Sequence, residues 1–144
     1  MIRFLVVDDD QEVRTIVRRM LENLDQSYTV TEASNGAKAL NELEKGRFEF
    51  LITDLKMDVV NGIDLIKNIN SITNAAPVII VCSGHREMVG NEISDLIDGY
   101  LDKPPNQQQL NELISQLIVS KKVTAVATSS SLLSRFLSPF KKSS

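Results

Sequence analysis

The apolar residues of this 144-residue chain fall into two alternating patterns. Short runs of apolar residues are separated by longer stretches in which apolar residues recur every three or four positions. The short runs predict buried strands, and the longer stretches predict amphipathic helices. Regular alternation of the two predicts an α/β domain, in which helices cover both faces of a parallel sheet.

Five strand and helix pairs are expected. The predicted strands are 3–7, 28–31, 50–53, 78–82 and 100–101. Four helices show a clear period, and their apolar residues span 13–24, 39–43, 65–72 and 110–118. A further helix is predicted between His85 and Leu96, where the apolar stripe is weak and Gly90 lies inside it. We expect that segment to be the most mobile element.

Two of the predicted strands end in acidic residues: the run 50–53 is followed by Asp54, and the run 4–7 is followed by Asp8, Asp9 and Asp10. Ligands of open parallel sheets bind at the carboxyl ends of the strands. Neighbouring carboxylates raise one another's pKa unless a cation neutralises them, and a hard ion such as Mg²⁺ prefers oxygen ligands. The pattern therefore predicts an acidic pocket that binds Mg²⁺.

Two more polar residues follow strands and are expected at the same edge. The ammonium of Lys103 would point at the pocket, and a carboxylate beside Mg²⁺ and a lysine is a nucleophile toward phosphorus. The hydroxyl of Ser83 can donate to a phosphoryl oxygen. Asp10 is interpreted as a helix cap, and Tyr100 either as a core aromatic or as a functional one.

Charge is distributed unevenly along the chain. The net charge is −3, but residues 1–119 hold all 19 acidic and 11 of the 16 basic side chains, a net charge of −8. The body is therefore not expected to bind nucleic acid directly. Cys82 is the single cysteine, which excludes an internal disulfide and favours a cytoplasmic location. No signal-peptide pattern or long apolar span is present.

A change of composition divides the chain into a domain at 1–120 and a basic, Ser-rich tail at 121–144. The tail contains a short amphipathic segment whose apolar residues are Leu132, Leu133, Phe136, Leu137 and Phe140. Three interpretations are open: a loosely ordered terminus, a docking peptide for a partner or for the domain itself, and a weak contact with a membrane surface.

Several separately placed motifs carry a family resemblance. They are Phe4-Leu5-Val6-Val7-Asp8-Asp9, Leu51-Ile52-Thr53-Asp54, Asn61-Gly62, Ser83-Gly84 and Tyr100-Leu101-Asp102-Lys103-Pro104. Together they resemble the response-regulator receiver domain of bacterial two-component signalling, over roughly residues 1–120. The resemblance implies a flavodoxin-like (βα)5 fold, a doubly wound five-stranded parallel sheet with strand order 2-1-3-4-5.

The resemblance also implies roles for individual residues. Asp54 would be the phosphoacceptor, and Mg²⁺ would be held by Asp9, Asp54, the main-chain carbonyl of Lys56 and, through water, Asp8. Ser83, Tyr100 and Lys103 would contact the phosphoryl group and change the partner-binding face. The implied partners are a sensor histidine kinase or a histidine phosphotransfer protein and an unidentified downstream protein. The domain would catalyse only its own phosphorylation and dephosphorylation.

The sequence departs from the family pattern at three positions. Asp58 replaces the usual proline four residues after Asp54, which predicts a less rigid loop. Cys82 stands at the usual place of the switch hydroxyl, one residue before Ser83. Pro105 replaces a common aromatic residue.

Single features of the sequence are also typical of other function classes. Asp8 and Asp10 have the D-x-D spacing of haloacid-dehalogenase-like phosphatases, which also use an Asp nucleophile with Mg²⁺, but Glu12 is atypical of that motif. A flavin-binding domain would need a Gly/Thr/Ser-rich phosphate loop after the first strand, and the sequence has none there. No DNA-binding or catalytic domain is expected within the 25 residues after the last helix, so a stand-alone receiver is predicted.

Overall fold

A computed structural model describes residues 1–121 and 123, and these form one five-stranded parallel sheet. Its strand order is β2-β1-β3-β4-β5, as the resemblance implied. The strands are β1 (Arg3–Val7), β2 (Thr29–Ala33), β3 (Phe50–Thr53), β4 (Val78–Ser83) and β5 (Gly99–Asp102). The central strand β3 is buried along its whole length, because neighbouring strands and helices enclose it on every side.

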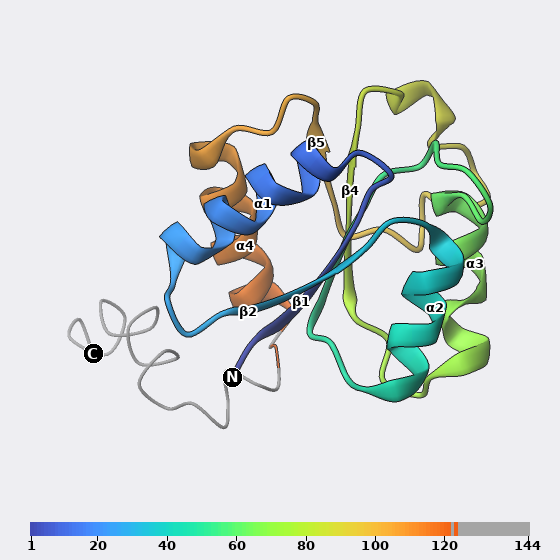
Figure 1. Ribbon diagram of the computed structural model, residues 1–144, viewed down its shortest axis with the longest axis horizontal. Coiled ribbons are helices and arrows are strands. Elements are labelled where there is room, and N and C mark those ends of the chain that lie inside the picture. The colour runs from blue at the N-terminus through green and yellow to red at the C-terminus, as the bar shows by residue number, and fades with distance from the viewer. Residues whose placement is uncertain (122, 124–144) are drawn as a thin grey trace.

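Two helices cover each face of the sheet (Figure 1). They are α1 (Gln11–Leu24) and α4 (Gln107–Ser120) on one face, and α2 (Gly36–Lys45) and α3 (Gly62–Ile72) on the other. Asp10 begins α1 as predicted, since its Oδ1 accepts a 2.9 Å hydrogen bond from the Glu12 amide. Gly46 is the C-cap residue of α2.

The helix predicted between His85 and Leu96 is wrong. That segment contains only a 3₁₀ turn, η1 (Arg86–Met88), followed by further turns. Gly90 lowers helix propensity here, and the few apolar residues pack as isolated anchors: Ile93 is 1% exposed, while Met88 and Val89 are partly buried. The described residues therefore contain four α-helices, and the β4–β5 connection is irregular.

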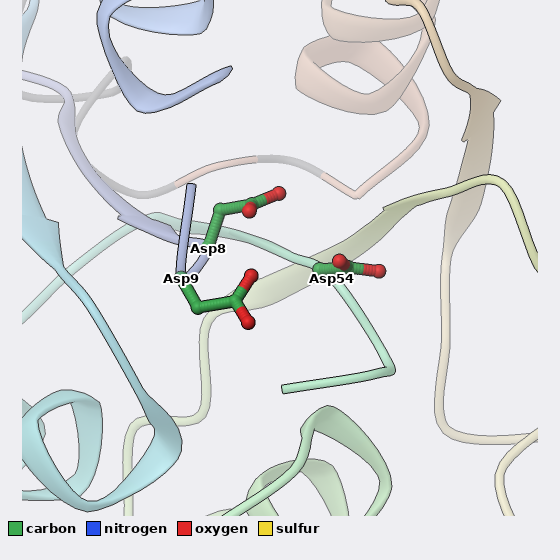
Figure 2. Close-up of side chains that lie close together, drawn as sticks. All are labelled: Asp8, Asp9 and Asp54. Atoms are coloured by element: carbon green, nitrogen blue, oxygen red, sulfur yellow. The ribbon is translucent and has the colours of Figure 1, made fainter. Parts of the chain in front are cut away.

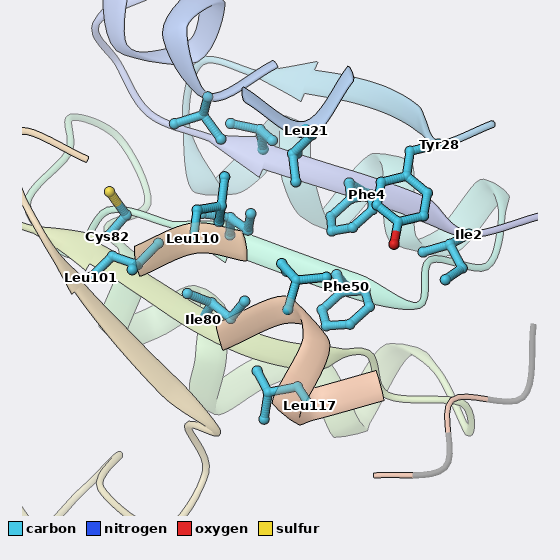
Figure 3. Packing of buried hydrophobic residues seen from close by; sticks show 14 of the residues in the cluster. Ile2, Phe4, Leu21, Tyr28, Phe50, Ile80, Cys82, Leu101, Leu110 and Leu117 are labelled. Atoms are coloured by element: carbon cyan, nitrogen blue, oxygen red, sulfur yellow. The ribbon is translucent and has the colours of Figure 1, made fainter. Parts of the chain in front are cut away.

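The core consists of two apolar clusters, one on each face of the sheet. On the α1 and α4 side, Phe4 stacks on Phe50 with ring centroids 4.8 Å apart, and Tyr28 lies 4.9 Å from Phe4 (Figure 3). Side chains of a strand alternate between the two faces, so each strand contributes to both clusters. This packing holds the carboxyl ends of β1, β3, β4 and β5 at one edge of the sheet.

The C-terminal segment predicted as a basic tail, 121–144, lies almost entirely outside the described residues. Lys121 pairs with Asp98 at 2.9 Å, and Val123 is buried against the α1 and α4 cluster. No helix within the described part of the chain is long and apolar enough to span a membrane.

Candidate functional site

Three carboxylates meet at the carboxyl ends of β1 and β3. One oxygen atom each of Asp8, Asp9 and Asp54 lies within 4.8 Å of the others, and Figure 2 shows the three side chains close together. Asp8 and Asp54 are 2% and 6% exposed, whereas Asp9 is open to solvent. The acidic pocket predicted from the strand ends is confirmed as a cluster that could bind a metal ion.

Lys103 joins two of these carboxylates from the end of β5. Its Nζ lies 2.7 Å from Asp8 Oδ2 and 2.9 Å from Asp54 Oδ2. Burial by itself lowers the pKa of this lysine, but hydrogen bonds to Asp8 and Asp54 outweigh that effect and raise the pKa above its ordinary value. Lys103 is therefore a permanent cation at neutral pH.

Each buried carboxylate is also held by the main chain. Oδ1 of Asp8 accepts a 2.9 Å hydrogen bond from the Asp10 amide, and Oδ1 of Asp54 accepts a 2.7 Å hydrogen bond from the Leu55 amide. Burial raises the pKa of Asp8, although Lys103 and the Asp10 amide oppose this shift. The two side chains are thus oriented before any ligand arrives.

The loop that follows Asp54 packs closely against it. The Gly62 amide donates a 2.9 Å hydrogen bond to the Leu55 main-chain oxygen, and a Cβ at Gly62 would overlap with the main-chain oxygen of Asp54. Lys56, the predicted carbonyl ligand, is exposed two residues after Asp54. Val59 has a φ of 66°, a region that β-branched residues rarely adopt. Because a Cβ does not fit at position 62, glycine is needed there for the start of α3 to approach the end of β3 closely.

The predicted switch residues lie beside this cluster. Ser83 ends β4 and is fully buried, and its Oγ accepts a 3.0 Å hydrogen bond from the His85 amide. Tyr100, in β5, donates a 2.9 Å hydrogen bond to the Ser83 main-chain oxygen. Tyr100 is half-buried and packs partly on the core, so both interpretations of this aromatic have a structural basis. The contact of the Ser83 hydroxyl with a phosphoryl group stays a prediction.

Arg86 makes two contacts that the sequence does not predict. Its guanidinium lies 4.0 Å from the centroid of the Tyr100 ring and 3.1 Å from Asp102 Oδ2. An arginine in an irregular loop carries no sequence signal for such a contact, because the partners lie 14 and 16 residues away in another strand. The tertiary fold alone brings the three side chains together.

The donor atoms of the cluster suit a hard divalent cation. Carboxylate oxygens are the ligands that Mg²⁺ and Ca²⁺ prefer, and Asp9 leaves the pocket open to solvent for the waters that Mg²⁺ retains. Asp10 is not part of the cluster, since its side chain caps α1. The cluster has the acceptors for a cation and, in Lys103, a donor for an anion.

Sequence comparison places the chain among proteins of two-component signalling. Residues 4–115 match the family described as the response regulator receiver domain. The chain is 33% identical over 118 residues to the chemotaxis protein CheY-3 of Vibrio cholerae, with 80% of this chain and 90% of that protein covered. It is 30% identical over 118 residues to the chemotaxis protein CheY of Pseudomonas aeruginosa, with 80% and 94% covered.

Solved structures share the fold. A receiver domain from Methylobacillus flagellatus superposes with a TM-score of 0.75 at 22% identity, over 81% of this chain and 98% of that one. The response regulator TrrA of Thermotoga maritima, solved with Mg²⁺ and a beryllium fluoride, has a TM-score of 0.72 at 26% identity, over 81% and 99%. TrrA in complex with the histidine kinase ThkA has a TM-score of 0.70 at 26% identity, over 82% and 99%.

Proposed function

Because the chain belongs to the response regulator receiver domain family, whose members are switches of two-component signalling, we propose that Asp54 is its phosphoacceptor. One observation supports this assignment above others: Lys103 lies between the buried carboxylates of Asp8 and Asp54 at the open acidic cluster. An ammonium in that place neutralises the acceptor and can then donate to an incoming phosphoryl oxygen.

The chain itself supplies the nucleophile and a hydrogen-bond donor for the transfer. A carboxylate oxygen of Asp54 attacks the phosphorus of the donor and forms a bond to it. The bond between phosphorus and the donor's nitrogen or oxygen breaks, and its electron pair leaves with that donor atom. Lys103 donates to the phosphoryl oxygens as charge shifts onto them, and the Leu55 amide holds the acceptor carboxylate in place. The domain thus catalyses its own phosphorylation, with the phosphodonor as its co-substrate.

We propose that the metal is Mg²⁺, held by Asp9, Asp54 and the main-chain carbonyl of Lys56, with Asp8 hydrogen-bonded to a retained water. When bound, Mg²⁺ supplies a second cation, in addition to Lys103, near the phosphoryl oxygens. Asp9 suits the ligand role because it is exposed and a carboxylate oxygen of it lies within 4.8 Å of one in Asp8 and one in Asp54. Lys103 offsets the charge of only one of the three carboxylates, and a divalent cation would offset the other two.

We propose a sensor histidine kinase or a histidine phosphotransfer protein as the donor, and an unidentified downstream protein as the target. TrrA, a structural relative, has been solved with the histidine kinase ThkA. We place the domain in the cytoplasm, since the single buried Cys82 forms no disulfide. The haloacid-dehalogenase alternative has no support: the comparisons match receivers, and Asp10, which its motif requires, caps α1.

Treatment of the full chain with acetyl phosphate and Mg²⁺, followed by intact mass spectrometry and peptide mapping, tests the acceptor. We expect one phosphoryl group per chain, on Asp54, and none on Asp54→Asn. Asp102→Asn is the matched control, since Asp102 is an exposed aspartate at the end of β5 and should leave labelling unchanged. Robust labelling of Asp54→Asn at Asp8 or Asp9 would refute the assignment.

A further inference from the structure

Strand register places Cys82 next to the acceptor. β3 and β4 are paired in parallel, with Ile52 opposite Ile80 and Thr53 opposite Val81. The next step along both strands brings Asp54 opposite Cys82. Cys82 is 3% exposed and pairs with Leu101 of β5, while the ladder with β3 ends one residue earlier, at Thr53 and Val81.

The face of the sheet on which each side chain lies separates Cys82 from Ser83. Ile80 and Cys82 pack in the cluster under α1 and α4, and Figure 3 shows Cys82 beside Leu101 and Leu110. Residues two apart share a face, so Asp54 follows Ile52 onto this same side. Val81 packs in the cluster under α2 and α3. Ser83 therefore projects to the face away from Asp54.

The remaining members of the acceptor site lie on the Cys82 side as well. Val6 and Leu101 belong to the α1 and α4 cluster, so the alternation of β1 and β5 puts Asp8 and Lys103 on that face. The thiol also senses their charges, because Lys103, Asp8 and Asp54 all act on its pKa, although burial is the dominant cause that raises the pKa to about 12. The thiol is thus neutral at pH 7 and lies among the acceptor groups.

We infer that Cys82, and not Ser83, is the β4 side chain that adjoins the phosphoryl group on Asp54, so that a weak donor occupies the place nearest its oxygens. This inference rests on the proposed function. A thiol is a poor hydrogen-bond donor, whereas a hydroxyl is a good one. The phosphoryl oxygens are consequently held by Lys103 and the metal, and the β4 side chain contributes little hydrogen bonding. The Oγ of Ser83 is engaged instead with the His85 amide.

The test uses ¹⁹F NMR to measure the affinity of the full chain for beryllofluoride, a phosphoryl mimic, in the presence of Mg²⁺. Cys82→Ser supplies a hydroxyl in a side chain of nearly the same shape, and we expect affinity to rise about fivefold, the gain from one added hydrogen bond. Cys82→Ala and Ser83→Ala should each change the affinity by less than about twofold. Thermal unfolding of every variant shows whether a change in affinity reflects folding, and a purely structural role for Cys82 predicts no gain in Cys82→Ser.

Other outcomes overturn the inference. If Ser83→Ala weakens binding about fivefold and Cys82→Ser changes nothing, the donor is Ser83. If neither substitution at Cys82 alters affinity, the thiol does not adjoin the phosphoryl group, and this comparison stands even if Ser83→Ala fails to fold. If wild type itself does not bind beryllofluoride with Mg²⁺, the proposed function fails as well, which distinguishes the two failures.

Discussion

The hydroxyl of Tyr100 donates a 2.9 Å hydrogen bond to the main-chain oxygen of Ser83, and so ties the aromatic residue of β5 to the end of β4. Arg86 covers the same ring at 4.0 Å and pairs with Asp102 at 3.1 Å. These contacts hold the irregular β4–β5 connection against the edge of the sheet that carries Asp54. A phosphoryl group on Asp54 therefore acts next to the least regular segment of the fold.

The first prediction concerns this segment as the switch. Beryllofluoride with Mg²⁺ should change amide hydrogen exchange most between Ser83 and Tyr100, because the phosphoryl mimic and the segment share one edge of the sheet. Arg86→Ala should raise exchange in the same region without the mimic, since it removes the contacts with the Tyr100 ring and Asp102.

Lys45→Ala is the matched control for that experiment, because Lys45 forms a surface ion pair with Glu42 on α2, far from the segment. Exchange between Ser83 and Tyr100 should then match wild type. If the mimic alters exchange only at Asp54 and in the loop 56–60, the domain still carries phosphate, but the assigned switch is wrong.

The second prediction separates a metal ligand from a helix cap. Asp9→Ala should lower Mg²⁺ affinity at least about tenfold, as expected for loss of a group that holds the metal, and should slow phosphorylation in parallel. Asp10→Ala should leave both near wild type and reduce the free energy of unfolding by about 1 kcal/mol through loss of the α1 cap. Calorimetric titration with Mg²⁺ and chemical denaturation measure the two effects. A larger loss of affinity in Asp10→Ala would shift the acidic pair by one residue and favour the phosphatase-like alternative.

The third prediction uses Gly62. A Cβ at this position would overlap with the main-chain oxygen of Asp54, and backbone cannot move aside as a side chain can. Gly62→Ala should therefore reduce the free energy of unfolding by about 1–3 kcal/mol and lower phosphorylation of Asp54. Gly90→Ala is the control, since no atom lies within 4 Å of the Cβ it would add. Equal stability of the two variants in urea denaturation would contradict the tight packing described above.

The fourth prediction concerns stability at high pH. Burial raises the pKa of Cys82 from 9.0 to about 12. Between these values the unfolded chain releases the thiol proton while the folded chain keeps it, so the unfolded state binds fewer protons and stability falls as pH rises. The slope contributed by the thiol approaches about 1.4 kcal/mol per pH unit.

Cys82→Ala removes this contribution, whereas Lys103 and Tyr100 titrate in both proteins. The free energy of unfolding, measured by urea denaturation from pH 8 to pH 11, should therefore fall more steeply for wild type than for Cys82→Ala. Parallel curves would mean that the thiol is not desolvated. Slow alkylation of native wild type at pH 8, compared with the unfolded chain, is the companion observation.

Local pattern alone predicted much of the fold. The apolar runs that end at Val7 and Thr53 are strands, and the acids that follow them meet in one cluster, because parallel strands present their carboxyl ends at one edge. Asp10 as the α1 cap was predictable for the same local reason. These features depend on residues close together in sequence, so the spacing of apolar residues and the chemistry of helix caps are enough to predict them.

The prediction of a helix between His85 and Leu96 was wrong because a few apolar residues can anchor a turn as well as a helix. Ile93 is buried, but Gly90 and the polar residues around it give no continuous apolar face. Tertiary packing against the α2 and α3 side of the sheet decided the outcome. The contacts of Arg86 with Tyr100 and Asp102 could not be predicted from the sequence either, since they depend on the path of the β4–β5 connection.

The sequence by itself determined which carboxylates, which lysine and which strand ends could build the site. Only the tertiary structure decided how they are paired and which neighbours they have. Lys103 contacts both Asp8 and Asp54, and Cys82, not Ser83, packs in the cluster with Val6, Ile52 and Leu101, from which we infer that it shares the acceptor's face of the sheet. The physical reason is that side chains alternate along a strand, so a difference of one residue reverses the face, and only the register with β3 fixes which residue of β4 faces the acceptor.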